Sequence, residues 1–309
     1  MQYPNKEYQV IVRIPNVNRD SRIGSVFNHI FSIMFQTEQT DTEGNVVWDF
    51  SECTFLHPFF IGAISLLKRQ YGDKIEILGI SGSVANYMNA ICFNSALDIK
   101  PDGNDEAFWE YYKGKTYLPL CVFHPYDDSS VKAQELIQKA VRQQLQFGST
   151  LNSIISLLLS ELIDNITEHS RSEEGFIFCQ SHPREKILYV FISDTGRSIY
   201  SSYVSDLRYI DSVTELESSG LLMALSGKST KDRPESENRG YGISKSRKLV
   251  VEGLCGEFFI LSGSAFARLD ANGEIVADLA GDFRWNGTAV LLKIPTVIPQ
   301  NFNIYNYIS

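Results

Sequence analysis

The run Leu151–Arg171, LNSIISLLLSELIDNITEHSR, decides the fold of the second half of the chain. Its dense apolar residues predict a helix. Glu161 and Asn165 lie four residues apart, so they project from one face of that helix. A polar pair on an apolar helix indicates either a binding role or a solvent-facing edge, and the spacing alone does not separate the two.

A second informative run is Ile187–Ile199, ILYVFISDTGRSI, in which a β-rich stretch stops at Asp194 and Gly196. An acid at the end of a strand, beside a flexible glycine, can reach a ligand at the sheet edge. A carboxylate there can accept a hydrogen bond from an exocyclic amine. Taken alone, Asp-Thr-Gly is more often a plain turn.

A third run is Asn238–Val250, NRGYGISKSRKLV, where Gly240 and Gly242 precede a helical pattern. Closely spaced glycines expose backbone N–H groups, and the start of a helix adds partial positive charge, so this run suits a phosphate. A single GxG is weak evidence by itself.

The fourth run is Arg284–Pro295, RWNGTAVLLKIP. It predicts a turn at Asn286 and Gly287, followed by Thr288 and a final strand. The alternative interpretation is a simple β-hairpin.

These four runs, in this order, resemble the GHKL ATPase superfamily, which includes gyrase, heat-shock chaperones, histidine kinases, MutL and the anti-sigma-factor serine kinases. The resemblance covers Leu151–Pro295 and is closest, in the N box, to the anti-sigma-factor serine kinases. It implies an α/β sandwich of the Bergerat type that binds ATP together with Mg²⁺.

The resemblance also implies roles for single residues. Asn165 would hold Mg²⁺, which needs few protein ligands. Asp194 would read the adenine amino group with support from Thr288, and Glu161 would orient or deprotonate the nucleophile that attacks the γ-phosphate. The other implied nucleotide contacts are Gly196, Lys228, Gly240, Tyr241, Gly242 and Ile243.

Between the two glycine boxes, Tyr200–Arg239 would form a lid. Its LSGKSTKDR stretch supplies Lys228, Lys231 and Arg233, which either contact phosphates or belong to a solvated loop. The first glycine box usually continues as DxGxG, whereas this chain has DTGRS. Ser198 therefore replaces a glycine and is expected to stiffen the lid hinge, which favours binding over fast turnover.

The amino-terminal half alternates strand and helix patterns, which favours an α/β layer. Predicted strands are Tyr8–Ile14, Val46–Phe50 and Lys74–Leu78, and predicted helices are Phe59–Tyr71 and Ser83–Phe93. In length and pattern, residues 46–93 resemble the STAS domain of anti-sigma-factor antagonists.

In that family a Ser or Thr at the start of a helix is phosphorylated. The corresponding residues here are His57, Pro58, Phe59 and Phe60, so the acceptor is missing. His57 is either an alternative acceptor or, as is commoner for a histidine beside proline, a structural residue.

Prolines and glycines concentrate in Lys100–Ser130, which predicts the domain junction. The overall prediction is an α/β protein of two domains, a STAS-like domain over residues 1–125 and a GHKL-type domain over residues 126–309. The second domain would begin with a linking amphipathic helix, Val131–Phe147.

The composition limits the classes of partner. The chain of 309 residues has a formal net charge of −9, which argues against nucleic acid. Five widely spaced cysteines predict buried reduced thiols, and no run of the chain reads as a signal peptide or a membrane span. We therefore expect a cytoplasmic protein.

The predicted function is a regulatory protein that binds Mg·ATP and acts as an ATPase or as a serine/threonine kinase on a protein partner. The expected partners are ATP or ADP and a protein, and a homodimer stays open. A histidine kinase is disfavoured, because Val131–Phe147 contains no histidine and such kinases carry Asn where this chain has Glu161. The non-enzymatic alternative is a nucleotide-sensing interaction module.

Overall fold

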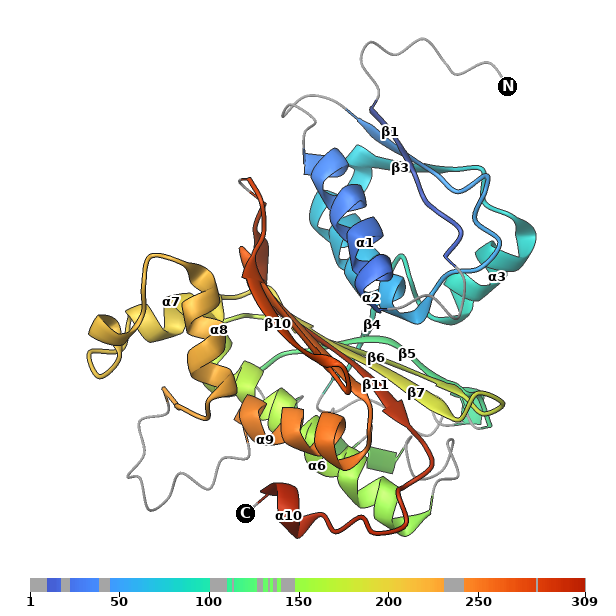
Figure 1. The fold of residues 1–309 in the computed structure, drawn as a ribbon. Coiled ribbons are helices and arrows are strands. Elements are labelled where there is room, and N and C mark those ends of the chain that lie inside the picture. Colours follow the sequence, from blue (N-terminus) through green and yellow to red (C-terminus); the bar gives the residue numbers. More distant parts are fainter. Residues whose placement is uncertain are drawn as a thin grey trace. The chain divides into compact units, whose positions relative to one another are not determined.

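The computed structural model is a mixed α/β protein that divides into two compact units, Met1–Ala96 and Leu97–Ser309 (Figure 1). The residues that the structure describes are 10–17, 23–38, 45–100, 110–112, 114–126, 130–132, 134–135, 138–139, 148–230, 242–281 and 283–308.

The first unit contains a parallel three-stranded sheet with strand order β1-β2-β3. The strands are β1 (Val10–Arg13), β2 (Val46–Asp49) and β3 (Ile75–Leu78), and the helices are α1 (Ile23–Glu38), α2 (Pro58–Tyr71) and α3 (Gly82–Ala90). The predicted strands and the last two helices are confirmed, although residues 8 and 9 of the first predicted strand lie outside the described residues and α3 ends three residues before Phe93. Helix α1 was not among the predicted ranges. Phe27 of α1 packs against Phe59 of α2, so these two helices are neighbours.

His57 caps the start of α2. Its Nδ1 accepts a hydrogen bond from the backbone N–H of Phe59 at 3.3 Å, and the side chain is buried. The ring also lies against the aromatic rings of Phe55 and Phe59. This capping contact gives His57 a structural role.

The second unit contains an eight-stranded sheet in the order β10-β9-β8-β11-β7-β6-β5-β4. Neighbouring strands are antiparallel except for β4 and β5, which are parallel. The strands are β4 (Leu97–Asp98), β5 (Tyr117–Phe123), β6 (Gly175–His182), β7 (Ile187–Asp194), β8 (Glu257–Gly263), β9 (Ala265–Asp270), β10 (Gly273–Asp278) and β11 (Trp285–Pro295).

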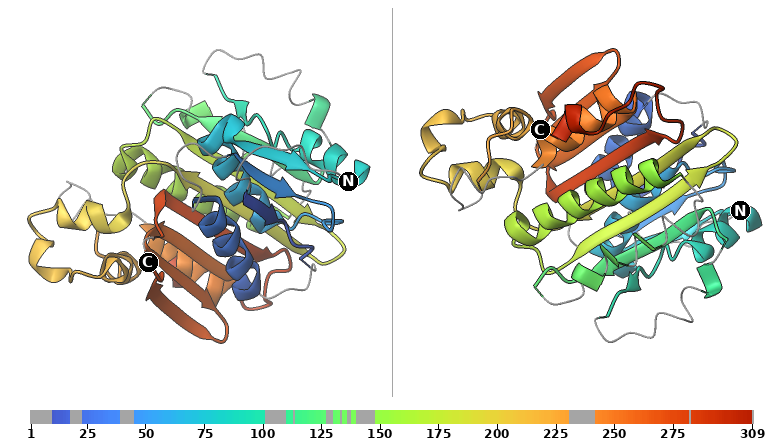
Figure 2. Two further views of the ribbon diagram at one scale, coloured as in Figure 1. Left: turned by 90° about the horizontal axis from the view of Figure 1, so that it is seen from above. Right: turned by 90° about the horizontal axis from the view of Figure 1, so that it is seen from below.

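The helices of the second unit lie over one face of this sheet or beside one of its ends (Figure 2). They are α6 (Ser149–Asn165) with a π-helical turn at Ile166–Ser170, α7 (Ile199–Val204), α8 (Glu217–Leu225), α9 (Gly242–Lys248) with a π-helical turn at Leu249–Gly253, and α10 (Tyr305–Ile308). Alternate residues of β7, Leu188, Val190 and Ile192, share a core with the apolar side of α6. The inward-facing side chains of the strand, at every second residue, therefore pack against the apolar face of α6, as both sequence patterns predict.

The boundary between the units lies between Ala96 and Leu97, whereas the sequence placed it after residue 125. The reason is strand pairing: β5 pairs with β6 of the second sheet, in the stretch whose prolines and glycines suggested a junction. In the predicted linking helix, residues 131–132, 134–135 and 138–139 are helical, and the rest of that range lies outside the described residues.

All five cysteines are free thiols. Cys53, Cys121 and Cys179 are buried as predicted, whereas Cys92 is only half-buried, and burial raises the pKa of Cys179 to about 12. Cys255 is exposed, because it lies in the turn between the end of the helical segment and β8, with a left-handed φ of 56°. In the part of the chain that the structure describes, no helix is both long enough and apolar enough to cross a membrane.

Candidate functional site

A cavity of about 550 Å³ opens on the helix side of the second sheet. Its wall comes from α6, from the end of β7, from Thr288 and Val290 of β11, and from α7, α8 and α9. Segments far apart in the sequence thus meet at one place. The predicted site residues that line it are Asn165, Asp194, Lys228, Gly242, Ile243 and Thr288.

Asp194 is the last residue of β7 and lies at the buried end of the cavity. The backbone N–H of Gly196 donates to its Oδ1 at 2.8 Å, and the backbone N–H of Thr288 donates to the same carboxyl group. Burial nevertheless dominates and raises the pKa of Asp194 to about 7. A strongly shifted acid in a cavity is typical of a functional site.

Gly196 is required by close packing and not by an unusual φ. A Cβ at this position would lie 2.1 Å from the carbonyl oxygen of Ser170. The backbone N–H of Arg197 donates to that same oxygen at 2.7 Å. The absence of a side chain therefore lets the end of β7 approach the π-helical turn that follows α6.

The predicted turn at Asn286 and Gly287 is wrong: both residues lie within β11, where the register shifts between Trp285 and Thr288. Such a bulge re-aims the side chains of a strand. Gly287 has a φ of 82°, and a Cβ there would lie 2.4 Å from the carbonyl oxygen of Asp194. The bulge thus brings the backbone of β11 against the buried acid.

Thr288 follows the bulge and is held by hydrogen bonds. Its Oγ1 lies 2.8 Å from the Oγ of Ser262 on β8, and its carbonyl oxygen accepts from the Oγ of Ser193 at 2.9 Å. Its side chain therefore has a fixed place beside Asp194 in the cavity wall.

Asn165 is the last residue of α6 and lines the cavity. Its Nδ2 is buried and has no hydrogen-bond partner among the described residues. Buried polar groups without partners are rare in proteins, and one at a cavity indicates a place for a polar ligand. The Nδ2 amide group is thus a hydrogen-bond donor without a partner among the described residues.

Glu161, one turn earlier on α6, is not among the described residues of the cavity wall. Its Oε2 accepts a hydrogen bond from the backbone N–H of Gly242 at 3.0 Å. Gly242 begins α9 with a φ of 47°. The carboxylate of Glu161 therefore joins α6 to the start of α9.

The charged part of the wall is mostly cationic. Asp194 is the one carboxylate among its described residues, whereas the cations are Arg197, Lys228, Lys245 and Lys248. In a chain of net charge −9 this local excess of positive charge favours an anionic ligand.

Several wall residues were not predicted from the sequence. His169 lies four residues after Asn165, so its helical spacing to a predicted residue was the available signal. Its carbonyl oxygen accepts from the Nε of Arg197 at 2.6 Å, and its Nδ1 lies 3.2 Å from the Oγ1 of Thr230. These contacts connect the end of α6 to the residues that follow β7 and α8.

Two tyrosines close another side of the cavity. Tyr203 of α7 donates its O–H to the carbonyl oxygen of Lys228, and burial raises the pKa of that phenol. Its ring meets the ring of Tyr209 edge to face, with 5.5 Å between the centroids. No periodic pattern in the sequence marks either residue, because α7 is less than two turns long.

Ser198, which replaces a glycine of the family pattern, is the N-cap of α7. Its Oγ accepts from the backbone N–H of Ser201 at 3.2 Å, and its φ of −68° needs no glycine. The serine that replaces glycine therefore stabilises the start of α7.

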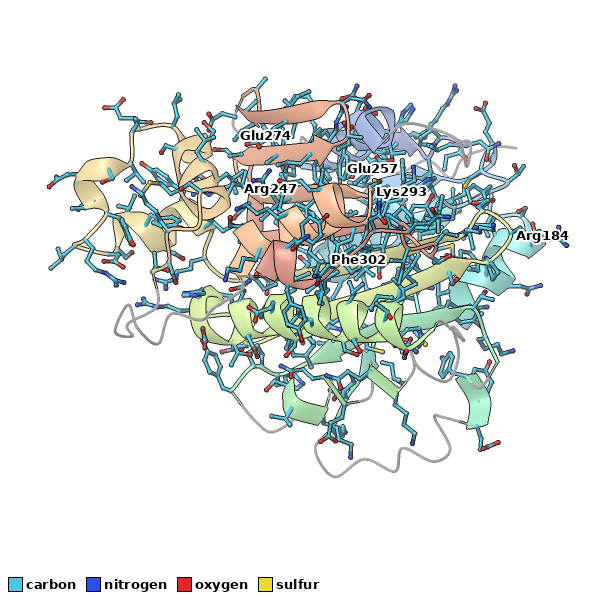
Figure 3. The ribbon with its side chains drawn as sticks, turned by 60° about the horizontal axis from the view of Figure 1, so that its bottom comes forward. Arg184, Arg247, Glu257, Glu274, Lys293 and Phe302 are labelled. Carbon is cyan, nitrogen blue, oxygen red and sulfur yellow. The ribbon has the colours of Figure 1, made fainter. Side chains whose placement is uncertain are left out.

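Helix α9 is fixed from outside the cavity (Figure 3). Arg247 lies 3.8 Å from Glu274 of β10, an ion pair between the helix and the sheet edge. Phe302 stacks on Tyr307 with 5.6 Å between centroids, and both rings pack against Gly253. The segment after β11 thus holds the helix whose first residue lines the cavity.

Four predicted residues, Lys231, Arg233, Gly240 and Tyr241, lie outside the described residues. In the described part of the predicted lid, residues 200–230, the chain forms α7, a short 3₁₀ turn and α8. The described residues contain no group of three or more His, Cys, Asp and Glu side chains that could hold a metal ion.

In comparisons with known proteins, no protein-family model and no curated protein matches this chain.

Proposed function

We propose that the second unit is a GHKL-type domain that binds Mg·ATP in the cavity, within a cytoplasmic regulatory protein that acts on a protein partner. One observation carries this proposal: a single cavity joins a buried acid, an unsatisfied asparagine and several cations. Each of the four runs that carry the family resemblance contributes a residue to the cavity wall: Asn165, Asp194, Gly242 and Thr288.

The buried end of the cavity suits adenine. Asp194 and Thr288 lie there together, beside the apolar side chains of Ile192 and Val290. A carboxylate accepts from an exocyclic amine, and apolar side chains bury the faces of a flat base. Adenine offers an exocyclic amine and flat apolar faces, whereas guanine carries a carbonyl oxygen where adenine carries the amine.

The cationic part of the wall suits phosphates. Lys228 and Lys245 contribute positive charge to the cavity that also contains Asn165, whose amide has an unsatisfied polar atom. An asparagine oxygen is an acceptable Mg²⁺ ligand, and Mg²⁺ keeps most of its waters. When bound, Mg²⁺ would neutralise phosphate charge. The unsatisfied Nδ2 of Asn165 is a hydrogen-bond donor, so it supports a contact with a phosphate oxygen, whereas the side-chain oxygen of Asn165 would be the Mg²⁺ ligand.

Two activities are proposed for this site, ATP hydrolysis and transfer of phosphate to a serine or threonine of a partner. In both, Glu161 orients or deprotonates the attacking hydroxyl or water. The runner-up is a nucleotide-sensing module without turnover. The place of Glu161 favours this alternative, because Glu161 is not among the described residues of the cavity wall and its Oε2 accepts from the backbone N–H of Gly242.

The first unit is proposed as a STAS-like interaction domain. Its parallel strands and intervening helices support an α/β layer of this kind. His57 caps α2, so it is committed to the fold and is a poor phosphate acceptor. We therefore assign this unit a docking role without phosphorylation.

Isothermal titration calorimetry with ATP, ADP and GTP, with and without Mg²⁺, tests the proposal. We expect binding of ATP and ADP, a preference over GTP, and a rise in melting temperature, because a ligand that binds only the folded state stabilises it. No detectable binding of either adenine nucleotide at millimolar concentration would falsify the proposal. Incubation with γ-labelled ATP then separates the activities. Hydrolysis releases labelled free phosphate, a kinase labels the protein partner, and a sensing module gives neither product.

A further inference from the structure

Exposed apolar side chains concentrate on residues 204–222, a segment that we call the α7–α8 tip. Among the described residues, five of the thirteen large apolar side chains that are exposed belong to it. The α7–α8 region stands at one end of the second unit, beside the sheet rather than over it (Figure 2). The five residues are Val204, Leu207, Ile210, Leu216 and Leu222.

The backbone of the tip is ordered by its own hydrogen bonds. The O–H of Tyr200 donates to the carbonyl oxygen of Thr214 at 2.9 Å, and the N–H of Thr214 donates to Ser219 at 3.1 Å. Helices α7 and α8 also pack closely, because a Cβ on Gly220 would lie 2.7 Å from the Cα of Tyr200. A fixed backbone holds the apolar side chains in place, which lowers the entropic cost of binding.

The cavity does not account for these exposed side chains. The inner side of the same region forms a small core of Tyr203, Met223 and Ala224, and Tyr203 also lines the cavity. Leu207 is 88% exposed and Leu222 is 50% exposed. Single exposed apolar residues are ordinary, but a group of them on one segment marks an interaction surface.

The charges of the tip indicate which partner fits. Asp206 and Arg208 pair with each other at 2.6 Å, whereas the exposed Asp211 and Glu215 have no ion pair among the described residues. The exposed residues of the tip therefore carry excess negative charge. Two copies of this chain would bring like charges together at such a contact, whereas a cationic partner would be attracted.

We propose that the α7–α8 tip docks a protein partner through an amphipathic segment whose apolar residues are flanked by lysine or arginine. The apolar side chains of the segment would cover Leu207 and Leu222, and its cations would lie near Asp211 and Glu215. The five exposed apolar side chains do not line the cavity, so the proposal stands whether or not the cavity binds a nucleotide.

Fluorescence anisotropy with the full chain tests the proposal. The probe is a synthetic amphipathic helix with a leucine stripe flanked by lysines, and the comparison peptide carries glutamates in place of the lysines. We expect the lysine peptide to bind about tenfold more tightly than the glutamate peptide. The double variant Leu207→Ser with Leu222→Ser should weaken this binding about tenfold.

The matched control is Ile275→Ser on β10, since Ile275 is 48% exposed and lies outside the tip. It should leave the affinity unchanged. The double variant Asp211→Asn with Glu215→Gln should weaken the lysine peptide several-fold and reduce the salt dependence of its binding. All substituted side chains are exposed, so the variants should keep the melting temperature of the wild type within a few degrees.

Equal affinity for the two peptides would overturn the proposal, and so would binding that the tip variants leave unchanged. Sedimentation equilibrium tests the other possible occupant of the tip, a second copy of this chain. A dimer of this chain that the Leu207→Ser and Leu222→Ser variant dissociates would also overturn it, because a second copy would then cover the tip.

Discussion

Replacing Asp194 with asparagine should stabilise the protein without ligand while weakening its binding of adenine nucleotides. Burial raises the pKa of Asp194 from 3.8 to about 7. Above pH 7 the folded protein therefore contains a buried, ionised carboxylate, which lowers its free energy of unfolding. A difference of about 3 in pKa corresponds to about 4 kcal/mol. The asparagine of the variant never ionises, so the variant escapes this cost.

The sign of the pH dependence follows from proton binding. Between pH 4 and pH 7 the folded wild type holds a proton on Asp194 that the unfolded chain has already released. Its free energy of unfolding therefore falls as the pH rises through this window, relative to the variant. The difference between the two proteins should change by roughly 2–3 kcal/mol from pH 5 to pH 8.

The absolute gain is smaller than this cost, because the substitution introduces a buried amide. The asparagine oxygen can still accept from Gly196, but its NH₂ group loses water, at about 1–3 kcal/mol. We therefore expect the variant to exceed the wild type by roughly 1–3 kcal/mol at pH 8. At pH 5 the advantage should largely vanish.

Urea denaturation followed by circular dichroism measures both proteins from pH 5 to pH 8. The exposed Ile275→Ser is the control, because it removes no ionisable group and its effect on stability should not vary over that range. A difference between wild type and Asp194→Asn that stays constant with pH would refute the burial of an ionisable acid at this position. Calorimetry on the same samples should show weaker ATP binding, because the amide can place a donor against the adenine amine.

Further predictions concern α6 and the end of β7. Glu161→Gln keeps an oxygen that can accept from the N–H of Gly242, so nucleotide binding should persist. Any ATP turnover should fall by about 10²–10⁴-fold, because the glutamine cannot take a proton. Loss of nucleotide binding in a folded variant would remove Glu161 from the catalytic role. Asn165→Ala should instead weaken Mg²⁺-dependent ATP binding, which a titration with and without Mg²⁺ detects. Gly196→Ala should destabilise the second unit by about 3 kcal/mol or more, because its Cβ would lie 2.1 Å from the Ser170 carbonyl oxygen. The matched control is Gly148→Ala, since a Cβ at Gly148 would meet open space. Equal melting temperatures for the two variants would contradict this packing argument.

Local patterns in the sequence determined the elements that carry the predicted site. Apolar spacing predicted the helix with Glu161 and Asn165, although the structure ends α6 at Asn165 and continues in a π-helical turn. The β-rich run ending at Asp194 is β7, with the predicted end. Such patterns are readable because the helix repeat and the strand alternation are set by neighbouring residues.

The tertiary structure alone decided how these pieces meet. The pairing of β5 with β6 moved the boundary between the units, and the bulge in β11 replaced the expected turn at Gly287. The burial that shifts the pKa of Asp194 depends on residues distant in sequence, as does the contact that requires Gly196. Pairing, burial and close approach arise between segments separated by tens of residues, so no local pattern in the sequence encodes them.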